Sequence, residues 1–381
     1  MREMARSSGS RKMSTFYLLF SGMAVLLLAS WPGLVVSSRP TADDSVKAGN
    51  HEAVKKDFLN WVDKVGEAHQ AHVQSGTVRI PYRDPDQILL AAAGNTITVG
   101  AGGQYSSVQA AVNAAGNSGR TTIVINSGTY EEKITVPKGK LITFQGNGNP
   151  TLVYGDTAGS AGSTANSAST AILADGFIAI GITFKNSAPA PLGGAVGKQA
   201  VALRISGDQG AFYNCNFYGA QDTLYDQAGR HYFKNCFIQG SIDFIFGDGQ
   251  SLYQSCQLNS IAQPGQGSLT AQKRTGNENT GFSFVGCTIT GTGPIYLGRA
   301  WGPNSRVVFI QCNIADIILP AGWYDWGVSS RENTVFYGQY ECSGPGANTS
   351  GRVGWSMELT AAQAVPFETV SFIDGSSWLQ T

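Results

Sequence analysis

Two aspartates stand at the same distance after two similar short segments of this chain. Asp222 comes seven residues after Cys215, and Asp243 comes seven residues after Cys236. If the two segments stack as neighbouring turns, the carboxylates lie about one strand spacing, roughly 4.8 Å, apart. Stacked like charges are destabilising unless one group is protonated, paired or used, and their proton affinities then split. One carboxyl group can therefore serve as an acid while the other, ionised, serves as a nucleophile.

Further side chains near these aspartates suit the same site. Gln221 directly precedes Asp222, and Arg299 in "YLGRAW" (296–301) is a cation that would keep the second carboxylate ionised. Trp301 in the same segment can stack on a sugar ring. Taken singly, an aspartate here is a turn residue that bonds its own backbone, and the arginine is a solvated surface residue. The shared register of the two aspartates favours a functional pair.

Histidine, serine and cysteine chemistry is disfavoured by the surroundings of those residues. After residue 72 the chain has one histidine, His231 in "GRHYF", and no serine stands in a G-x-S-x-G elbow, so we expect no Ser-His-Asp triad. The cysteines are not paired as C-x-x-C, and no His/Cys metal spacing occurs. We therefore expect no metal and no cofactor, and interpret His231 as a structural residue beside the cleft.

The elements that must position these residues are short strands in a repeat. Five of the six cysteines are preceded by an aromatic residue three positions earlier and followed by an apolar residue two positions later, at successive separations of 21, 20, 31 and 25 residues. Self-similarity at this period is typical of a solenoid. Because the cysteine and the apolar residue share a strand face, we predict an all-β fold, a parallel β-helix. The copies are "FYNCNF" (212–217), "FKNCFI" (233–238), "YQSCQL" (253–258), "FVGCTI" (284–289) and "FIQCNI" (309–314).

The same register predicts that the cysteines form a ladder through the stacked turns. Small buried hydrophobic residues are the default interpretation of such a ladder. Disulfides between adjacent turns are a second possibility, because the spacing between turns falls within the usual Cα range of a disulfide. A secreted chain would permit them. The sequence leaves both interpretations open.

The net charge and the N-terminal residues indicate the class of partner and the location of the protein. The 26 basic and 26 acidic residues give a formal net charge of zero, which argues against a nucleic-acid partner. Residues 1–38 have a basic start, an apolar run from Phe16 to Ala29 and small residues before Arg39, the pattern of a secretory signal peptide. An uncleaved membrane anchor is the alternative, because the apolar stretch approaches spanning length. We predict a secreted protein, with residues 39–94 as a polar arm or linker.

At this point the motifs resemble those of a known family, the plant pectin methylesterases or pectinesterases. The similarity covers about residues 95–379, and the motifs occur in the family's order. It implies a right-handed, single-stranded parallel β-helix as the catalytic domain. It also implies hydrolysis of the methyl esters of homogalacturonan, giving pectate and methanol, in the extracellular cell wall. The motifs are "GTYEEK" (128–133), "QAVALR" (199–204), "GAQDTL" (219–224), "DFIFG" (243–247) and "YLGRAW" (296–301).

Carried over by position, the resemblance assigns the reacting groups. Asp243 corresponds to the nucleophile, which attacks the ester carbonyl and forms an acyl intermediate. Asp222 corresponds to the general acid that protonates methanol and then acts as the base toward water. Gln221 and Gln199 resemble the pair that stabilises the oxyanion.

The resemblance also implies residues that bind the substrate. Arg299 resembles the residue that holds Asp243 and contacts the substrate, and Trp301 resembles a residue that stacks on sugar. Thr170, in "SASTAIL", resembles a substrate-contacting threonine. The chain departs from the family at Ala300, where relatives have proline; without the proline ring we expect a looser Trp301 loop.

Partners follow from the same comparison. Many relatives carry a long inhibitor-like region with four cysteines before the catalytic part, whereas residues 39–94 are short and cysteine-free, so we expect the form without that pro-region. Methyl-esterified pectin is the expected substrate, a separate proteinaceous inhibitor is a second candidate partner, and a monomer is the default. The sequon "NTS" makes Asn348 a candidate glycosylation site.

Two other classes of function compete with the esterase. A β-helix lyase would need a calcium cluster of acidic residues, and a glycosidase would need a carboxylate pair around a glycosidic bond. The small number of acids near the site and the two glutamines favour an esterase. A catalytically silent wall-binding protein is the third hypothesis, for which the indication is Ala300.

Overall fold

A computed structural model describes residues 95–379 of the chain, apart from residues 193, 264–266 and 277. The predicted signal peptide (1–38) and the polar arm (39–94) lie outside the described residues. Among the described residues, no helix is long and apolar enough to cross a membrane.

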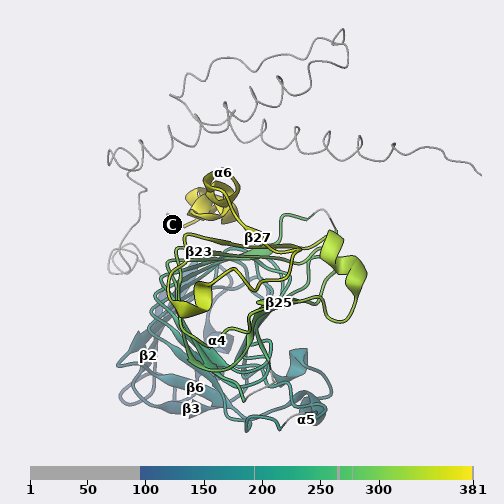
Figure 1. Ribbon diagram of the computed structural model, residues 1–381. Coiled ribbons are helices and arrows are strands. Elements are labelled where there is room, and N and C mark those ends of the chain that lie inside the picture. The colour runs from purple at the N-terminus through teal and green to yellow at the C-terminus, as the bar shows by residue number, and fades with distance from the viewer. Residues whose placement is uncertain (1–94, 193, 264–266, 277, 380–381) are drawn as a thin grey trace, which may run out of the picture. The chain divides into compact units, whose positions relative to one another are not determined.

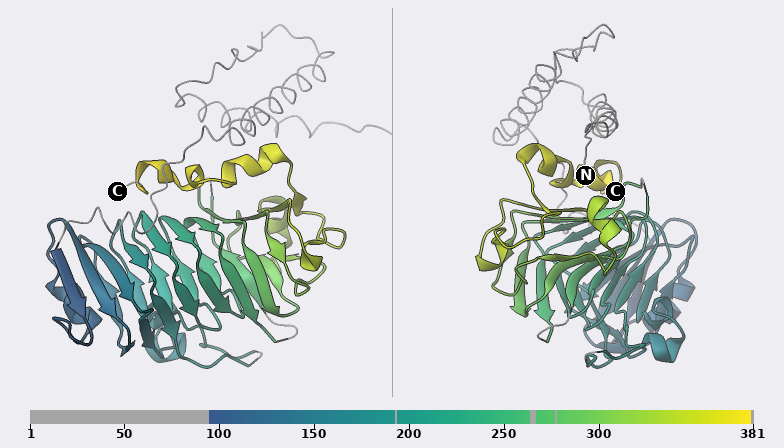
Figure 2. Two further views of the ribbon diagram at one scale, coloured as in Figure 1. Left: turned by 90° about the vertical axis from the view of Figure 1, so that its left-hand side faces the viewer. Right: turned by 45° about the vertical axis from the view of Figure 1, so that its right-hand side comes forward.

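This part of the chain winds into a right-handed parallel β-helix, as predicted (Figure 1). Most turns contribute one strand to each of three walls, the end turns contribute to fewer, and each strand pairs in parallel with its counterpart in a neighbouring turn. Figure 2 shows the strands stacked one beside the next from the N-terminal turns to the C-terminal turns. Residues about one turn apart in sequence therefore become neighbours in space.

Within the described residues, sheet A has 11 strands in the order β1 (Asn95–Val99), β2 (Arg120–Asn126), β5 (Leu141–Asn147), β8 (Ile178–Ile180), β11 (Gly210–Tyr213), β14 (Arg230–Lys234), β17 (Gln250–Gln254), β20 (Gly281–Val285), β23 (Arg306–Ile310), β26 (Phe336–Tyr340) and β27 (Met357–Glu358). In the same described range, sheet B has eight strands: β3 (Thr129–Glu131), β6 (Thr151–Tyr154), β9 (Thr183–Asn186), β12 (Asn216–Tyr218), β15 (Phe237–Gly240), β18 (Gln257–Ile261), β21 (Thr288–Thr292) and β24 (Asn313–Ile314). Sheet C, counted over those residues, also has eight: β4 (Ile134–Val136), β7 (Thr170–Ile172), β10 (Leu203–Ile205), β13 (Leu224–Asp226), β16 (Ile245–Gly247), β19 (Ser268–Gln272), β22 (Tyr296–Ala300) and β25 (Trp323–Tyr324).

The corner between sheets A and B explains the residue that precedes each repeated cysteine. Asn214, Asn235 and Ser255 have φ angles of 52°, 52° and 53°, in the left-handed region. Asparagine and glycine tolerate this conformation better than most residues. One left-handed residue turns the chain from a sheet A strand into the next sheet B strand, and the repeat preserves that turn.

The aromatic residues of the repeat form a stack inside the helix. Phe212, Phe233, Tyr253, Phe284 and Phe309 occupy matching positions in successive sheet A strands. Their ring centroids are 4.8, 4.6, 4.6 and 4.7 Å apart, and the rings are close to parallel. Because these side chains are fully buried, the stack fixes the register of the turns.

The cysteine ladder consists of free thiols, so the disulfide interpretation is wrong. All six cysteines are unpaired with one another; five are buried and Cys342 is half-buried. The Cys256 thiol donates to the carbonyl oxygens of Phe233 and Gln254, each at 3.5 Å. Burial raises the pKa of the Cys256 thiol well above its ordinary value. The ladder therefore packs as small hydrophobic residues with little thiolate character.

Helix α4 (Val108–Ala114) packs its buried side chains into the core at the N-terminal turns. Its N-cap, Ser107, accepts from the backbone N–H of Ala110. The Glu132 carboxylate accepts hydrogen bonds from the Ser107 hydroxyl and from the first backbone N–H groups of the helix. The N-terminus of a helix favours a negatively charged side chain, so this contact stabilises the helix start. The other short helices lie in loops: α5 (Ala158–Ala161), η1 (Ala165–Ser167), η2 (Ser329–Asn333) and η3 (Pro345–Ala347).

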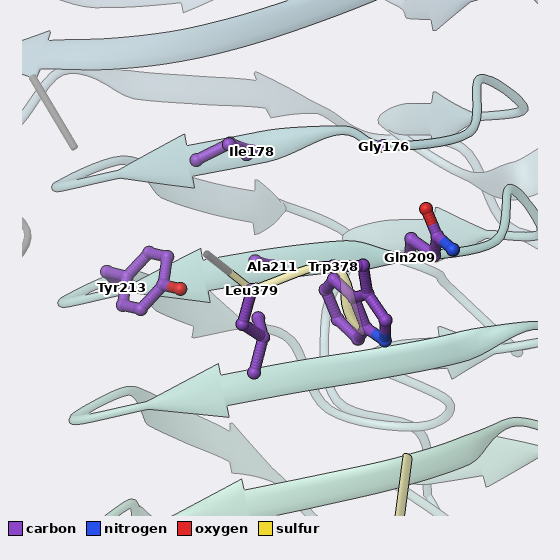
Figure 3. A pocket seen from close by; sticks show the side chains of 7 residues that line it. All are labelled: Gly176, Ile178, Gln209, Ala211, Tyr213, Trp378 and Leu379. Carbon is purple, nitrogen blue, oxygen red and sulfur yellow. The ribbon is translucent and has the colours of Figure 1, made fainter. Parts of the chain in front are cut away.

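The C-terminal segment covers the outer face of sheet A. It contains α6 (Ala361–Ala364), η4 (Val365–Phe367), η5 (Val370–Ile373) and η6 (Gly375–Ser377). Its apolar side chains form a second cluster with outward residues of sheet A, including Tyr232 and Leu252. Figure 3 shows Trp378 and Leu379 beside Ala211, where they line a small pocket. This packing covers sheet A from β8 onward and leaves the site on another wall.

Candidate active site

The two aspartates singled out by spacing occupy equivalent positions on adjacent turns. Gln221 forms a parallel bridge with Ile242, and the Asp222 N–H donates to the Ile242 carbonyl oxygen at 2.9 Å. Asp222 and Asp243 follow these bridge residues directly, at the corner between sheets B and C. The two residues are 7% and 6% exposed. The structure thus brings both carboxyl groups together beside sheet C.

Both aspartates take a left-handed backbone conformation. The φ angle is 64° at Asp222 and 50° at Asp243. Aspartate and asparagine adopt this region more readily than most residues, so each aspartate is a genuine turn residue as well as a member of the pair. Unusual backbone conformations of this kind are often found at functional sites.

Asp243 is held on both carboxylate oxygens. Arg299 in β22 donates from Nε to Oδ1 at 2.6 Å and from Nη2 to Oδ2 at 2.5 Å. The Ser268 hydroxyl in β19 also donates to Oδ1. A bidentate guanidinium contact fixes the orientation of a carboxylate and favours its ionised form. Asp243 therefore projects a fixed, negatively charged group at this corner.

Asp222 has the opposite electrostatic environment. Burial, and next the negative charge of Asp243, raise the pKa of Asp222 well above its ordinary value, while Arg299 acts in the other direction. No side-chain hydrogen bond joins the Asp222 carboxyl group to another described residue. One carboxyl group of the pair is thus set up to hold its proton beside an ionised partner.

The two glutamines lie on the same corner. The backbone N–H of Ala200, next to Gln199, donates to the carbonyl oxygen of Gln221 at 3.0 Å. Both glutamines are half-buried, and neither side-chain amide bonds another described residue. Three successive turns of the β-helix therefore carry Gln199, Gln221 and Asp243 at this corner. The two side-chain amides are available as donors to a ligand.

An aromatic strip, defined here as Tyr225, Phe246, Trp301 and Trp326, lies on the outer side of sheet C. Tyr225 and Phe246 stack with centroids 4.3 Å apart, and Trp301 lies 6.1 Å from Phe246. The Arg299 guanidinium carbon is 4.1 Å from the centre of the Trp326 ring. Aromatic faces beside polar groups are suited to sugar rings.

Thr170 does not reach this surface. It is fully buried in β7, and its hydroxyl has no partner among the described residues. Thr170 and Ile172 lie on the face that packs into the core, whereas Ala171 between them belongs to the cluster on the outer face. The prediction that Thr170 contacts substrate is corrected by this placement, because strand alternation turns its side chain inward.

Ala300 is also buried, and its backbone is tied. Arg331 donates from Nη1 to the Ala300 carbonyl oxygen at 2.5 Å, and Ala300 pairs with Gln272 of the neighbouring strand. The following Trp301 N–H donates to the Arg299 carbonyl oxygen at 3.0 Å. These bonds restrain the backbone at the position where relatives have proline, and the looser Trp301 loop stays a prediction.

His231 lies inside the helix rather than beside the cleft. It is fully buried, with Nδ1 2.5 Å from Asp226 Oδ1 and Nε2 2.9 Å from the Gly207 carbonyl oxygen. The Tyr253 hydroxyl donates to the second oxygen of Asp226 at 2.7 Å. The cluster satisfies buried polar groups in the core, which agrees with a structural role and corrects its position.

Several residues of the site escaped sequence reasoning. Tyr225 and Phe246 each follow a site aspartate by three residues, so the register that pairs the aspartates also pairs the rings. Ser268 and Trp326 stand in no repeated motif, and no sequence signal marks them. In the described part of the chain, no group of three or more His, Cys, Asp or Glu side chains is arranged to hold a metal ion.

Comparisons with known proteins agree on one family. The family model described as Pectinesterase matches residues 95–376. "Probable pectinesterase 8" of Arabidopsis thaliana is 50% identical over 289 residues, which are 72% of this chain and 74% of that protein. "Pectinesterase QRT1" of the same plant is 47% identical over 293 residues, 73% of this chain and 77% of that protein. The solved structure "Pectin methylesterase from Carrot" matches with a TM-score of 0.71 at 37% identity, covering 76% of this chain and 96% of that chain.

Proposed function

This chain belongs to the pectinesterase family and removes methyl esters from pectin, and we propose that it does so through nucleophilic attack by Asp243. The observation that carries this assignment is the bidentate Arg299–Asp243 pair beside a second carboxyl group whose pKa is raised by burial. An ionised nucleophile and a protonated acid then coexist in one site at the same pH.

The first half of the reaction forms an acyl-enzyme. A carboxylate oxygen of Asp243 attacks the carbonyl carbon of the methyl ester, and the carbonyl electrons move onto oxygen. Oδ2 has one donor, whereas Oδ1 has two, so Oδ2 keeps more of its lone-pair capacity for the attack. The amides of Gln221 and Gln199 donate to the developing oxyanion. The bond to methoxide then breaks, and Asp222 donates its proton so that methanol leaves.

The second half returns the enzyme to its starting state. Asp222, now ionised, takes a proton from water while the water oxygen attacks the acyl carbon. The bond between the acyl carbon and Asp243 breaks, which restores the Asp243 carboxylate and the proton on Asp222. The products are one methanol and one carboxylic acid on the polymer, with one water consumed, and the acid then releases its proton to solvent to become a carboxylate.

Location and modification are further parts of the proposal. The basic start and the apolar run within residues 1–38 support secretion, and the substrate of the family supports action in the cell wall. Asn348 is exposed and accepts a hydrogen bond from the Ser350 N–H at 3.0 Å, which supports access by a glycosylating enzyme. A monomeric state and binding of a proteinaceous inhibitor stay predictions.

Product analysis of the purified protein tests the proposed function. Incubated with methyl-esterified homogalacturonan, the protein should release methanol without new reducing ends and without unsaturated ends. New reducing ends would indicate a glycosidase, and unsaturated ends would indicate a lyase. Absence of all three products would favour the silent wall-binding protein.

A further inference from the structure

One cation beside the aromatic strip is not used by the mechanism above. The Lys273 ammonium lies 4.5 Å from the centre of the Trp301 ring, and Lys273 is exposed. This cation–π contact places the charge over the ring. The ammonium makes no hydrogen bond or ion pair with any other residue in the described part of the chain.

The neighbouring cations are engaged, which distinguishes Lys273 from them. Arg274 donates from Nε to the Glu278 carbonyl oxygen at 2.7 Å. Arg306 donates from Nε to the Thr280 carbonyl oxygen at 2.8 Å. These two guanidinium groups hold loop backbone, whereas the Lys273 charge is directed at no protein acceptor.

Asp248, an acid close enough to Lys273 to feel its charge, is hydrogen-bonded to other residues. Asp248 Oδ1 accepts from the Thr280 hydroxyl at 2.6 Å and from the Gln272 amide at 3.4 Å. Burial raises the pKa of Asp248, although Lys273 is close enough to act in the opposite direction. Asp248 Oδ1 is already bonded within the protein, and among the described residues no hydrogen bond or ion pair joins Asp248 to Lys273. The Lys273 ammonium is therefore available to an external anion.

Lys273 stands at the end of the aromatic strip that borders the reacting carboxylates. Its backbone N–H donates to the Gly247 carbonyl oxygen at 2.7 Å, and Gly247 lies four residues after Asp243. Trp301, beneath the ammonium, lies two residues after Arg299 and contacts Phe246. The Lys273 ammonium covers one face of the Trp301 ring. A substrate chain that extends along the aromatic strip from the reacting ester to this face therefore contacts the ammonium first.

We propose that Lys273, supported by Trp301, forms a subsite for the free carboxylate of an unesterified galacturonate unit in the substrate chain. This inference rests on the proposed function, since it takes a galacturonan as the ligand. A methyl-esterified unit has no charge at this position, whereas a hydrolysed unit has a full negative charge. Each turnover produces such a carboxylate, so a partly hydrolysed chain gains an ionic contact that a fully esterified chain lacks.

The test compares two substrates and three variants. kcat/KM is measured on fully esterified and on about half-esterified homogalacturonan for wild type, Lys273→Gln, Lys273→Arg and Lys185→Gln. Lys185 is a matched control, because it is exposed on sheet B and has no ion pair among the described residues. We expect Lys273→Gln to lower the ratio of kcat/KM for half-esterified over fully esterified substrate about three- to five-fold, the upper part of the range for an exposed charge pair. Lys273→Arg should restore the ratio, and Lys185→Gln should leave it at the wild-type value.

A binding measurement separates this inference from the proposed function. A short, fully unesterified oligogalacturonate is titrated into each variant at low and at high salt. Wild type and Lys273→Arg should bind more tightly than Lys273→Gln at low salt, and the difference should shrink at high salt. Equal binding by wild type and Lys273→Gln, or equal losses in the glutamine and arginine variants, would overturn the subsite. Failure of wild type to release methanol would instead overturn the proposed function, while the titration would still decide whether Lys273 binds carboxylate.

Discussion

Arg299 donates two hydrogen bonds to the Asp243 carboxylate: Nε is 2.6 Å from Oδ1 and Nη2 is 2.5 Å from Oδ2. The contact joins two turns of the β-helix across 56 residues of sequence. The contact fixes the orientation of the Asp243 carboxylate and compensates its negative charge. The planar guanidinium group also packs against the Trp326 ring. Lysine can supply the charge but not the two parallel donors.

Arg299→Lys should therefore lower activity more than it lowers stability. Loss of one charge-assisted hydrogen bond costs about 1.5–3 kcal/mol, which is about ten- to a hundred-fold in kcat if the bond is needed in the transition state. Arg230→Lys is a matched control, because Arg230 forms a similar two-point pair with Asp208 away from the site. Methanol release should fall in the first variant and stay near wild type in the second. Equal activity in the two variants would remove the positioning role of Arg299.

Asp222→Asn should lose activity and gain stability at neutral pH. Asn suits the left-handed conformation of this residue but cannot shuttle a proton, so kcat should fall about 10²- to 10⁴-fold. Because the folded-state pKa of Asp222 is raised, its carboxyl stabilises the fold fully below the unfolded pKa, near 3.9, and progressively less as pH rises toward the folded pKa. Thermal unfolding of both proteins from pH 4 to pH 7 checks this. The variant's advantage in Tm should grow with pH, and an advantage that shrinks with rising pH would show the sign to be wrong.

Gln221→Ala should lower kcat and leave KM nearly unchanged. An amide that donates to the oxyanion acts mainly in the transition state, and losing one such donor costs about 2.7–4 kcal/mol. Gln257→Ala, an exposed glutamine on sheet B, serves as the control. Steady-state kinetics of methanol release decide the matter. A rise in KM at constant kcat would mean that Gln221 binds the ground state instead.

The cysteine ladder makes a chemical prediction of its own. Because all six cysteines are free, unfolding the protein in denaturant without reductant should expose six thiols per chain to a thiol reagent. In the native state the raised thiol pKa values and the burial of the ladder should make labelling slow. Added reductant should leave Tm unchanged. A count of four thiols, or a fall in Tm on reduction, would restore the disulfide interpretation.

Much of this arrangement was predictable because the fold is a repeat. Equal spacing after Cys215 and Cys236 predicted that Asp222 and Asp243 would meet, since stacked turns convert sequence period into spatial contact. The residue before each of these two cysteines is an asparagine with positive φ, which a local pattern can express. Features that recur with the period were therefore accessible from the sequence.

Contacts of residues that lie outside both the repeat and the recognised motifs were not accessible. In the three-residue strand that contains Thr170, the first and third side chains face inward. Which alternate residues of a strand face inward depends on the residue at which the preceding loop ends. Ser268 reaches Asp243 from a strand whose sequence has no counterpart in the repeat. The clustering of Trp326 over Arg299 depends on a loop outside the repeat. Such contacts depend on how individual loops pack, and the periodicity of the sequence does not predict that packing.

The most direct test of the nucleophile is Asp243→Asn, compared with Asp374→Asn. Both aspartates have φ near 50°, so each substitution keeps a residue that tolerates the backbone, and Asp374 lies in the C-terminal segment away from the site. Methanol release from methyl-esterified homogalacturonan is measured for wild type and both variants, with circular dichroism and Tm as folding controls. We predict a loss of at least about a thousand-fold for Asp243→Asn with an unchanged fold, and wild-type activity for Asp374→Asn. Near-normal methanol release by folded Asp243→Asn would contradict the account.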